Sequence, residues 1–99
     1  MPDAELTLMA ELTFLEPAGS ELLAALATVV ERTRAESGCL GYTAHLHADD
    51  PRRVLFLERW AGQAALDRHW ASEHLAAFRE FVTPRLAAPP TLTFWRSLG

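Results

Sequence analysis

The sequence predicts an α+β fold in which helices cover one face of an antiparallel sheet. Four short segments alternate apolar and polar residues with a period of two, which is typical of strands. Between them, longer stretches repeat apolar residues at helical spacing. The chain has 99 residues, the size of one typical domain, so we expect a single domain over residues 1–99.

The first half of the chain contains a strand and a long helix. Residues 6–14 alternate strictly, with the leucines on one face, and predict a strand. Residues 20–37 carry apolar side chains at helical spacing and predict an amphipathic helix. Ser20 suits its N-cap, and Gly38 suits the position that ends it.

Two further strands follow and are expected to form a hairpin. Residues 39–48 alternate, and the turn-forming residues 49–52 separate them from a third strand at 53–60. This third strand is apolar on both faces, because Leu55 and Leu57 lie opposite its other apolar residues. We therefore expect it to be a central strand that is covered on both sides.

The last part predicts a pair of helices and a final strand. Leu66, His69 and Trp70 share one helical face, and Ser72 is a candidate N-cap for the next helix. Prolines stop that helix, and residues 91–98 favour a strand.

The order of these elements is βαββαβ, which is the ferredoxin-like arrangement with its helices on one sheet face. The opposite face would stay open, although the third strand supplies apolar residues to it. Packing against a second copy of the chain is the simplest way to bury that face, so we expect a homodimer.

Composition excludes several classes of function. The net charge of −4 and the pI near 5.5 argue against a surface for nucleic acids or anionic membranes. All 9 basic residues are arginines, so a lysine Schiff base is excluded. The single cysteine allows no internal disulfide and no cysteine-based zinc site. With no apolar leader and no long apolar run, a cytoplasmic protein is expected.

Four stretches together resemble the antibiotic biosynthesis monooxygenase (ABM) family. They are residues 38–42, 49–51, 56–60 and 65–74, in matching order and spacing. The resemblance implies a small dimeric α+β barrel, and the members that oxidise polyphenols use no metal or flavin. Some members oxidise quinols, anthrones or related polyphenols with O₂, others degrade haem, and many have no known activity.

The sequence departs from the family's best-known sites at three positions. Phe56 stands where anthrone-oxidising members carry an Asn, and Leu66 stands where they carry a Tyr. Arg79 takes roughly the place of a His used by haem-degrading members, and the chain contains no Asn. The resemblance therefore argues against haem degradation and retains only part of the anthrone-oxidising set.

Glu58 and Trp60 are candidate catalytic residues on the third strand. The indole of Trp60 could hold a substrate oxygen and stack on an aromatic ring, or it could simply fill the core. Glu58 points to the same apolar side, so it needs a partner or a raised pKa. Arg96, His69 and His74 are candidate partners. A buried base could deprotonate a phenol, whereas the alternative is a structural ion pair or a solvated rim.

His69 is the third catalytic candidate, since it faces inward and titrates near neutral pH. His74 shares a helix face with Phe78. Either histidine could instead be structural. Their separation of five residues does not match the i, i+4 pairing of a helical metal site. With no matched set of histidines and carboxylates in the sequence, we predict no metal and no other cofactor.

Two functions from different classes follow. The first is a cofactor-independent monooxygenase of a small quinol, polycyclic phenol or anthrone, with O₂ as co-substrate. Its substrate would bind between sheet and helices, against Phe56, Leu66, Trp70, His74 and Phe78. The alternative is a non-catalytic dimeric module that binds an aromatic ligand or regulates in response to it. Uptake of O₂ by metal-stripped protein distinguishes the two.

Overall fold

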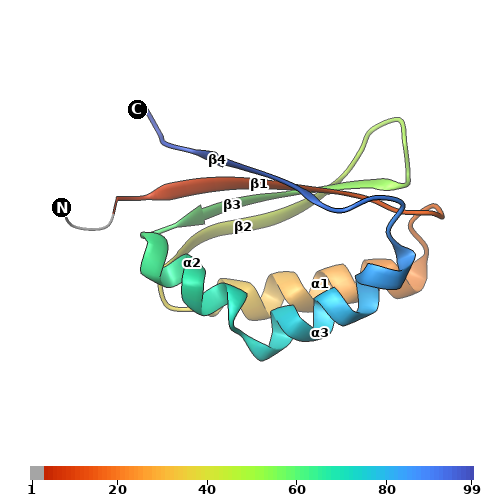
Figure 1. Cartoon of the computed structure of the whole chain (residues 1–99), viewed down its shortest axis with the longest axis horizontal. Helices are drawn as coiled ribbons and strands as arrows, with labels where there is room; N and C mark the ends of the chain where they lie inside the picture. Colours follow the sequence, from red (N-terminus) through yellow and green to blue (C-terminus); the bar gives the residue numbers. More distant parts are fainter. Residues whose placement is uncertain (1–3) are drawn as a thin grey trace.

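A computed structural model describes residues 4–99 and shows a four-stranded sheet with helices packed against it (Figure 1). The elements, in chain order, are β1 (Leu6–Thr13), α1 (Ser20–Arg34), β2 (Cys39–Leu46), β3 (Arg53–Trp60), α2 (Gln63–Trp70), α3 (Glu73–Val82), the 3₁₀ turn η1 (Thr83–Arg85) and β4 (Thr91–Trp95).

The sheet is antiparallel, with strand order β2-β3-β1-β4. The registers place Phe56 of β3 opposite both Ala10 and Ala44, and Leu92 of β4 opposite Ala10. This confirms the predicted ferredoxin-like α+β fold and the interior position of β3. The match is close because strict alternation fixes which face each strand residue occupies.

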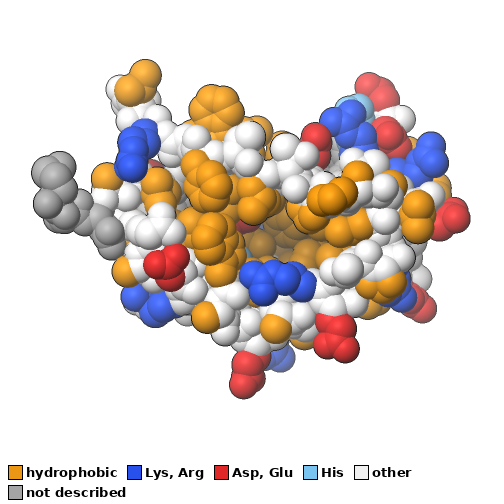
Figure 2. Space-filling view, in the orientation of Figure 1, with side chains coloured by type: hydrophobic (Ala, Val, Ile, Leu, Met, Phe, Trp, Pro, Cys, Tyr) orange, Lys and Arg blue, Asp and Glu red, His pale blue; other side chains and the backbone are white. Residues whose placement is uncertain are grey.

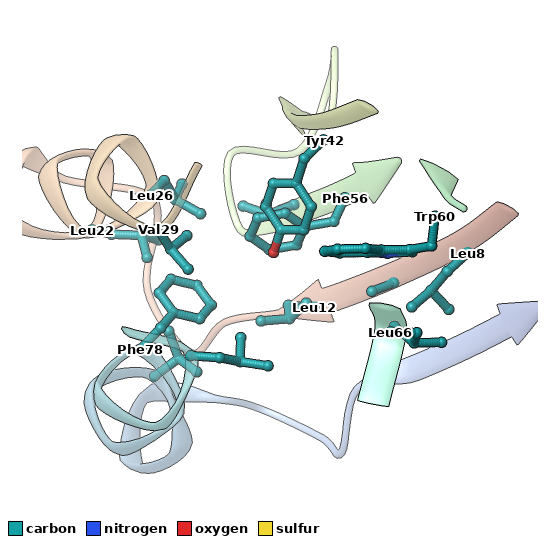
Figure 3. Close-up of a cluster of buried hydrophobic side chains, with 14 of the residues drawn as sticks. Leu8, Leu12, Leu22, Leu26, Val29, Tyr42, Phe56, Trp60, Leu66 and Phe78 are labelled. Atoms are coloured by element: carbon teal, nitrogen blue, oxygen red, sulfur yellow. The ribbon is translucent and has the colours of Figure 1, made fainter. Parts of the chain in front are cut away.

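All helices lie on one face of the sheet (Figure 1), and the core fills the space between the two layers. Leu8, Phe56 and Trp60 come from the sheet, and Val29 and Phe78 come from the helices (Figure 3). The structure confirms Ser72 as the N-cap of α3, because its hydroxyl accepts a hydrogen bond from the Leu75 amide at 3.3 Å.

Helix α1 begins and ends differently from the prediction. Gly19, not Ser20, is the N-cap, and Ser20 is the first helical residue. The helix ends at Arg34 rather than at residue 37, because the amide of Glu36 bonds to the Thr33 carbonyl at 3.0 Å and tightens the last turn. Gly38 does adopt a positive φ of 86°, but it lies beyond the helix.

Three strands are shorter than predicted, and the first of them, β1, ends at Thr13 instead of residue 14. β2 ends at Leu46 instead of residue 48, because the His47 ring accepts hydrogen bonds from the amides of Asp49 and Asp50 and closes the hairpin turn. β4 ends at Trp95 instead of residue 98, where its pairing with β1 ends.

The sheet face opposite the helices carries apolar side chains that stay exposed. Leu57, in the middle of β3, is 40% exposed, and Trp95 on β4 is 53% exposed. This is the face that we expect a second copy to cover, and the dimer remains a prediction.

None of the helices in residues 4–99 has the length and apolar character needed to cross a bilayer. The expected cytoplasmic location remains a prediction.

Candidate active site

A cavity of about 820 Å³ lies between the sheet and α3 and continues along the segment that leads to β4. Its volume falls within the range of small-molecule sites in proteins, roughly 300–1,000 Å³. Figure 2 shows it as a hollow lined by hydrophobic side chains. The apolar wall includes Leu8, Leu12, Phe56, Trp70, Leu75, Phe78 and Leu92.

Four ionisable side chains interrupt this apolar wall. They are Tyr42 on β2, Glu58 on β3, His69 on α2 and Arg79 on α3. Glu58 and His69 are 4% and 1% exposed, so both meet the cavity from a largely desolvated position. An apolar ligand with one polar group suits such a wall.

Glu58 is held by Trp60 and has a strongly shifted pKa. The indole Nε1 of Trp60 donates a hydrogen bond to Oε1 of Glu58 at 3.0 Å. Burial raises the pKa of Glu58 to about 7, the bond from Trp60 opposes this rise, and the charge of Glu36 adds to it. Glu58 can therefore gain or lose a proton near neutral pH.

The partner of Glu58 was predicted wrongly. We expected Arg96, His69 or His74, but the observed partner is Trp60. The two histidines instead share Glu36, and Arg96 lies beyond the end of β4.

His69 and His74 meet on one oxygen of Glu36. Nδ1 of His69 and Nε2 of His74 each lie 2.7 Å from Oε2 of Glu36. Burial lowers the pKa of His69, while its hydrogen bond to Glu36 and the charge of Glu36 act in the opposite direction. His69 is therefore neutral near pH 7 and able to accept a proton.

The expectation that no matched set of histidines and carboxylates exists was wrong. Glu36, His69 and His74 are of the side-chain types found in metal sites, and their ligand atoms lie within 4.8 Å of one another. Sequence spacing did not indicate this set, because Glu36 is 33 residues from His69 along the chain. Each nitrogen is nevertheless at hydrogen-bond distance from the shared oxygen. Ligand atoms bound to one tetrahedral ion, with bonds of about 2.0–2.1 Å, lie roughly 3.3 Å apart. That separation exceeds the 2.7 Å between each nitrogen and the Glu36 oxygen.

The predicted site residues divide into those that line the cavity and those that do not. Phe56, Glu58, His69, Trp70 and Phe78 lie together in the cavity wall. They come from β3, α2 and α3, so the fold brings together residues that the sequence separates by up to 22 positions.

The other predicted site residues do not line the cavity. Trp60 and Leu66 are fully buried behind its wall, at 0% exposure. Trp60 still adjoins the cavity residues, because its ring centroid lies 4.6 Å from that of His69 and its N–H holds Glu58. His74 lines a different groove, between α1 and α3.

Three ionisable residues in or beside the cavity wall were not predicted as members of the site: Tyr42, Arg79 and Glu36. Tyr42 packs against Phe56 and His69, with ring centroids 5.4 Å apart in both pairs, and burial raises the pKa of its hydroxyl. Strand alternation places Tyr42 on the same face of its strand as Ala44 and Leu46, which could have pointed to it. Arg79 had a signal only in the family comparison, where it takes roughly the place of a functional His, and Glu36 gave none, because it lies among the polar residues of its segment.

The sequence pattern of one protein family, described as antibiotic biosynthesis monooxygenase, matches residues 6–80. The chain belongs to this family. The ABM match runs from the start of β1 into α3 and includes every ionisable residue described in the cavity wall.

Individual relatives agree with this membership. A Mycobacterium tuberculosis protein, Rv0793, whose name assigns it provisionally as a monooxygenase, is 40% identical over 76 residues, or 77% of this chain and 74% of its own. The solved structure of Rv0793 aligns over 97% of both chains, with a TM-score of 0.84.

Two further solved structures share this fold. PA3566 from Pseudomonas aeruginosa aligns over 100% of this chain and 99% of its own, with 29% identity and a TM-score of 0.88. SnoaB from Streptomyces nogalater, described as a cofactor-independent oxygenase, has a TM-score of 0.81 over 96% of this chain and 94% of its own. Its sequence identity is 14%, so this likeness concerns the fold.

Proposed function

We propose that this ABM protein is a cofactor-independent monooxygenase that oxidises a small quinol or a polycyclic phenol or anthrone with O₂. One observation carries the proposal. An apolar cavity of about 820 Å³ has two buried proton acceptors in its wall: Glu58, whose pKa is raised to about 7, and His69, whose pKa is lowered. Family membership and the monooxygenase name of Rv0793 support the reaction type.

In this reaction the protein's role is to remove a proton from the substrate. Loss of a proton from a phenol or an anthrone gives an electron-rich anion that O₂ can oxidise directly. For an anthrone, the CH₂ group becomes C=O, and the second oxygen atom leaves as water, so the substrate supplies all four electrons. A positioned base contributes about 10²–10⁴-fold to such a step.

The cavity suits an anionic aromatic intermediate. Phe56, Trp70 and Phe78 provide aromatic surface for a planar ring. Among the described residues of the wall, Arg79 carries the one permanent positive charge, which favours a phenolate or enolate over its neutral form. The wall thus combines ring binding, proton acceptance and charge stabilisation.

The deciding experiment is O₂ uptake by metal-stripped protein offered a panel of quinols and anthrones. We expect consumption of one O₂ per anthrone oxidised, with activity lost in the double variant Glu58→Gln and His69→Ala. Binding of panel members without O₂ uptake would replace the proposal by the non-catalytic binding module. Activity that returns only when iron or copper is restored would contradict the cofactor-independent mechanism.

The homodimer belongs to the same proposal. The ABM resemblance implies one, and the exposed apolar residues Leu57 and Trp95 on the open sheet face support it.

A further inference from the structure

Glu36 lies outside the cavity wall, yet it contacts the ring of one of its proton acceptors. Its Oε2 lies 2.7 Å from Nδ1 of His69, and its side chain is 15% exposed. The chain around it is fixed: the Cys39 amide bonds to the Glu36 carbonyl at 3.2 Å, and the Ala61 amide bonds to the Gly38 carbonyl at 2.8 Å. The carboxylate is therefore held in place rather than free on the surface.

A second donor holds the same oxygen. Nε2 of His74 lies 2.7 Å from Oε2, and the two histidines are themselves fixed relative to each other by Ser72. The Ser72 hydroxyl donates to the His69 carbonyl at 2.6 Å and accepts from the Leu75 amide at 3.3 Å. An ionised carboxylate has no proton to donate, so each imidazole nitrogen that bonds to Oε2 of Glu36 carries an N–H.

This geometry determines which nitrogen of His69 carries the proton. A neutral imidazole has one N–H and one bare nitrogen, and the carboxylate selects the N–H at Nδ1. Nε2 is then the bare nitrogen. None of the residues in the range 4–99 is hydrogen-bonded to Nε2, and His69 belongs to the cavity wall.

We propose that Glu36 is a positioning residue that keeps His69 in its Nδ1–H form, so that Nε2 is the base that takes a proton from the substrate. The catalytic part rests on the proposed monooxygenase function, whereas the orientation of His69 does not. In the step itself, the substrate O–H or C–H proton moves to Nε2, its electron pair stays on the substrate, and the resulting imidazolium is stabilised by the Glu36 carboxylate.

The groups around His69 define what a titration will report. Glu36 contacts Nδ1 and shares the same oxygen with His74, Tyr42 packs on the ring, and Arg79 and Glu58 share its cavity wall. Among these, removal of the Glu36 charge withdraws the contribution that raises the pKa of His69.

The test uses ¹⁵N NMR of histidine-labelled protein without substrate, with the His69 signals assigned from His69→Gln. We expect the wild type to show Nδ1–H and a bare Nε2 at pH 8. Glu36→Ala should lose this preference, and both Glu36→Ala and Glu36→Gln should lower the pKa of His69. The matched control is Glu31→Gln, an exposed carboxylate on α1, which should change neither quantity. An Nε2–H form in the wild type would overturn the proposal, as would an unchanged His69 in Glu36→Ala.

Kinetics test the catalytic part separately. With a substrate that the wild type oxidises, Glu36→Gln should lower kcat about 10- to 100-fold with little change in KM, the usual effect of losing the partner that orients an imidazole. The acid limb of its pH–rate profile should move to lower pH. An unchanged profile and kcat would overturn the catalytic part. If no substrate is oxidised at all, the proposed function fails, and the NMR result still decides the orientation.

Discussion

Glu58 is a carboxylate that the fold holds among apolar side chains, and this has a consequence for stability. Burial raises its pKa from 4.5 to about 7, so the folded protein binds its proton more tightly than the unfolded chain does. The contribution to stability is fully present below the unfolded pKa and is lost as the pH rises through about 7. Because the pKa of Glu58 is raised, the folded protein is less stable in mildly alkaline solution than at lower pH.

Replacing Glu58 by Gln should remove this pH dependence. Gln keeps an oxygen that accepts from Trp60 and carries no charge. Above pH 8 we expect Glu58→Gln to be more stable than the wild type by up to about 3 kcal/mol, with little difference near pH 4. Urea unfolding at both pH values, at one protein concentration, measures this. A difference between the two proteins that does not vary with pH would show that ionisation of Glu58 is not its cause.

Trp60→Phe should act through Glu58 rather than through direct contact with a ligand. The change removes the indole N–H of Trp60. That N–H donates to Oε1 of Glu58 at 3.0 Å and stabilises the ionised form of the carboxylate. We expect the pKa of Glu58 to rise further, as seen by ¹³C NMR of the labelled carboxyl group. Stability should fall by about 1–3 kcal/mol because the buried ring is trimmed. Trp95→Phe, on the exposed β4, is the control, and a similar pKa shift there would count against a direct effect of the Trp60 N–H.

At the scale of elements, the corner between α1 and β2 places Glu36 against α2. Gly38 makes this possible, because its φ of 86° favours glycine and a Cβ there would lie 2.6 Å from the Cβ of Ala65. The backbone of the corner at Gly38 therefore packs against the side chain of Ala65 at the start of α2. The contact between Glu36 and His69 depends on that fit.

Gly38→Ala should destabilise the protein by about 2–4 kcal/mol, since it combines a left-handed backbone with an overpacked contact. Gly41→Ala is the matched control, because its Cβ would meet nothing closer than 3.8 Å. Urea unfolding compares the two. Equal midpoints for the two variants would show instead that the corner adjusts freely to an added methyl group.

The elements also show what sequence could and could not determine. Alternation is local, so β3 was predicted residue for residue, and the burial of Glu58 followed from it. The end of α1 was not predicted, because a tightened last turn and packing against α2 determine it. The bond between Glu36 and His69 depends on that end, and no periodicity links residues 33 apart. Sequence spacing also does not determine which of several nearby side chains becomes the hydrogen-bond partner, as Trp60 does for Glu58.

For the whole molecule, the open sheet face is an apolar surface that the fold leaves to a partner. β3 is interior to the sheet, yet Leu57 in its middle is 40% exposed. A second copy packed on this face would remove such side chains from water, at roughly 25 cal/mol per Å² of apolar surface.

Light scattering should therefore give a mass of twice 11.0 kDa at micromolar concentration. Leu57→Asp should dissociate and destabilise the protein, because it would place a charge in a dry interface. Leu23→Asp makes the same change at a 50% exposed leucine on α1, on the helix side, and should leave the mass unchanged. A monomeric wild type would refute the dimer.

Cys39, the one thiol of the chain, makes the corner beside Glu36 accessible to a chemical probe. It begins β2 directly after Gly38, it is half-buried, and burial raises the pKa of its thiol. Since the thiolate is the reactive form, a thiol reagent modifies this side chain slowly while the corner stays closed. The rate of alkylation thus reports how strongly the closed corner shields this thiol and suppresses its ionisation, with no ligand present.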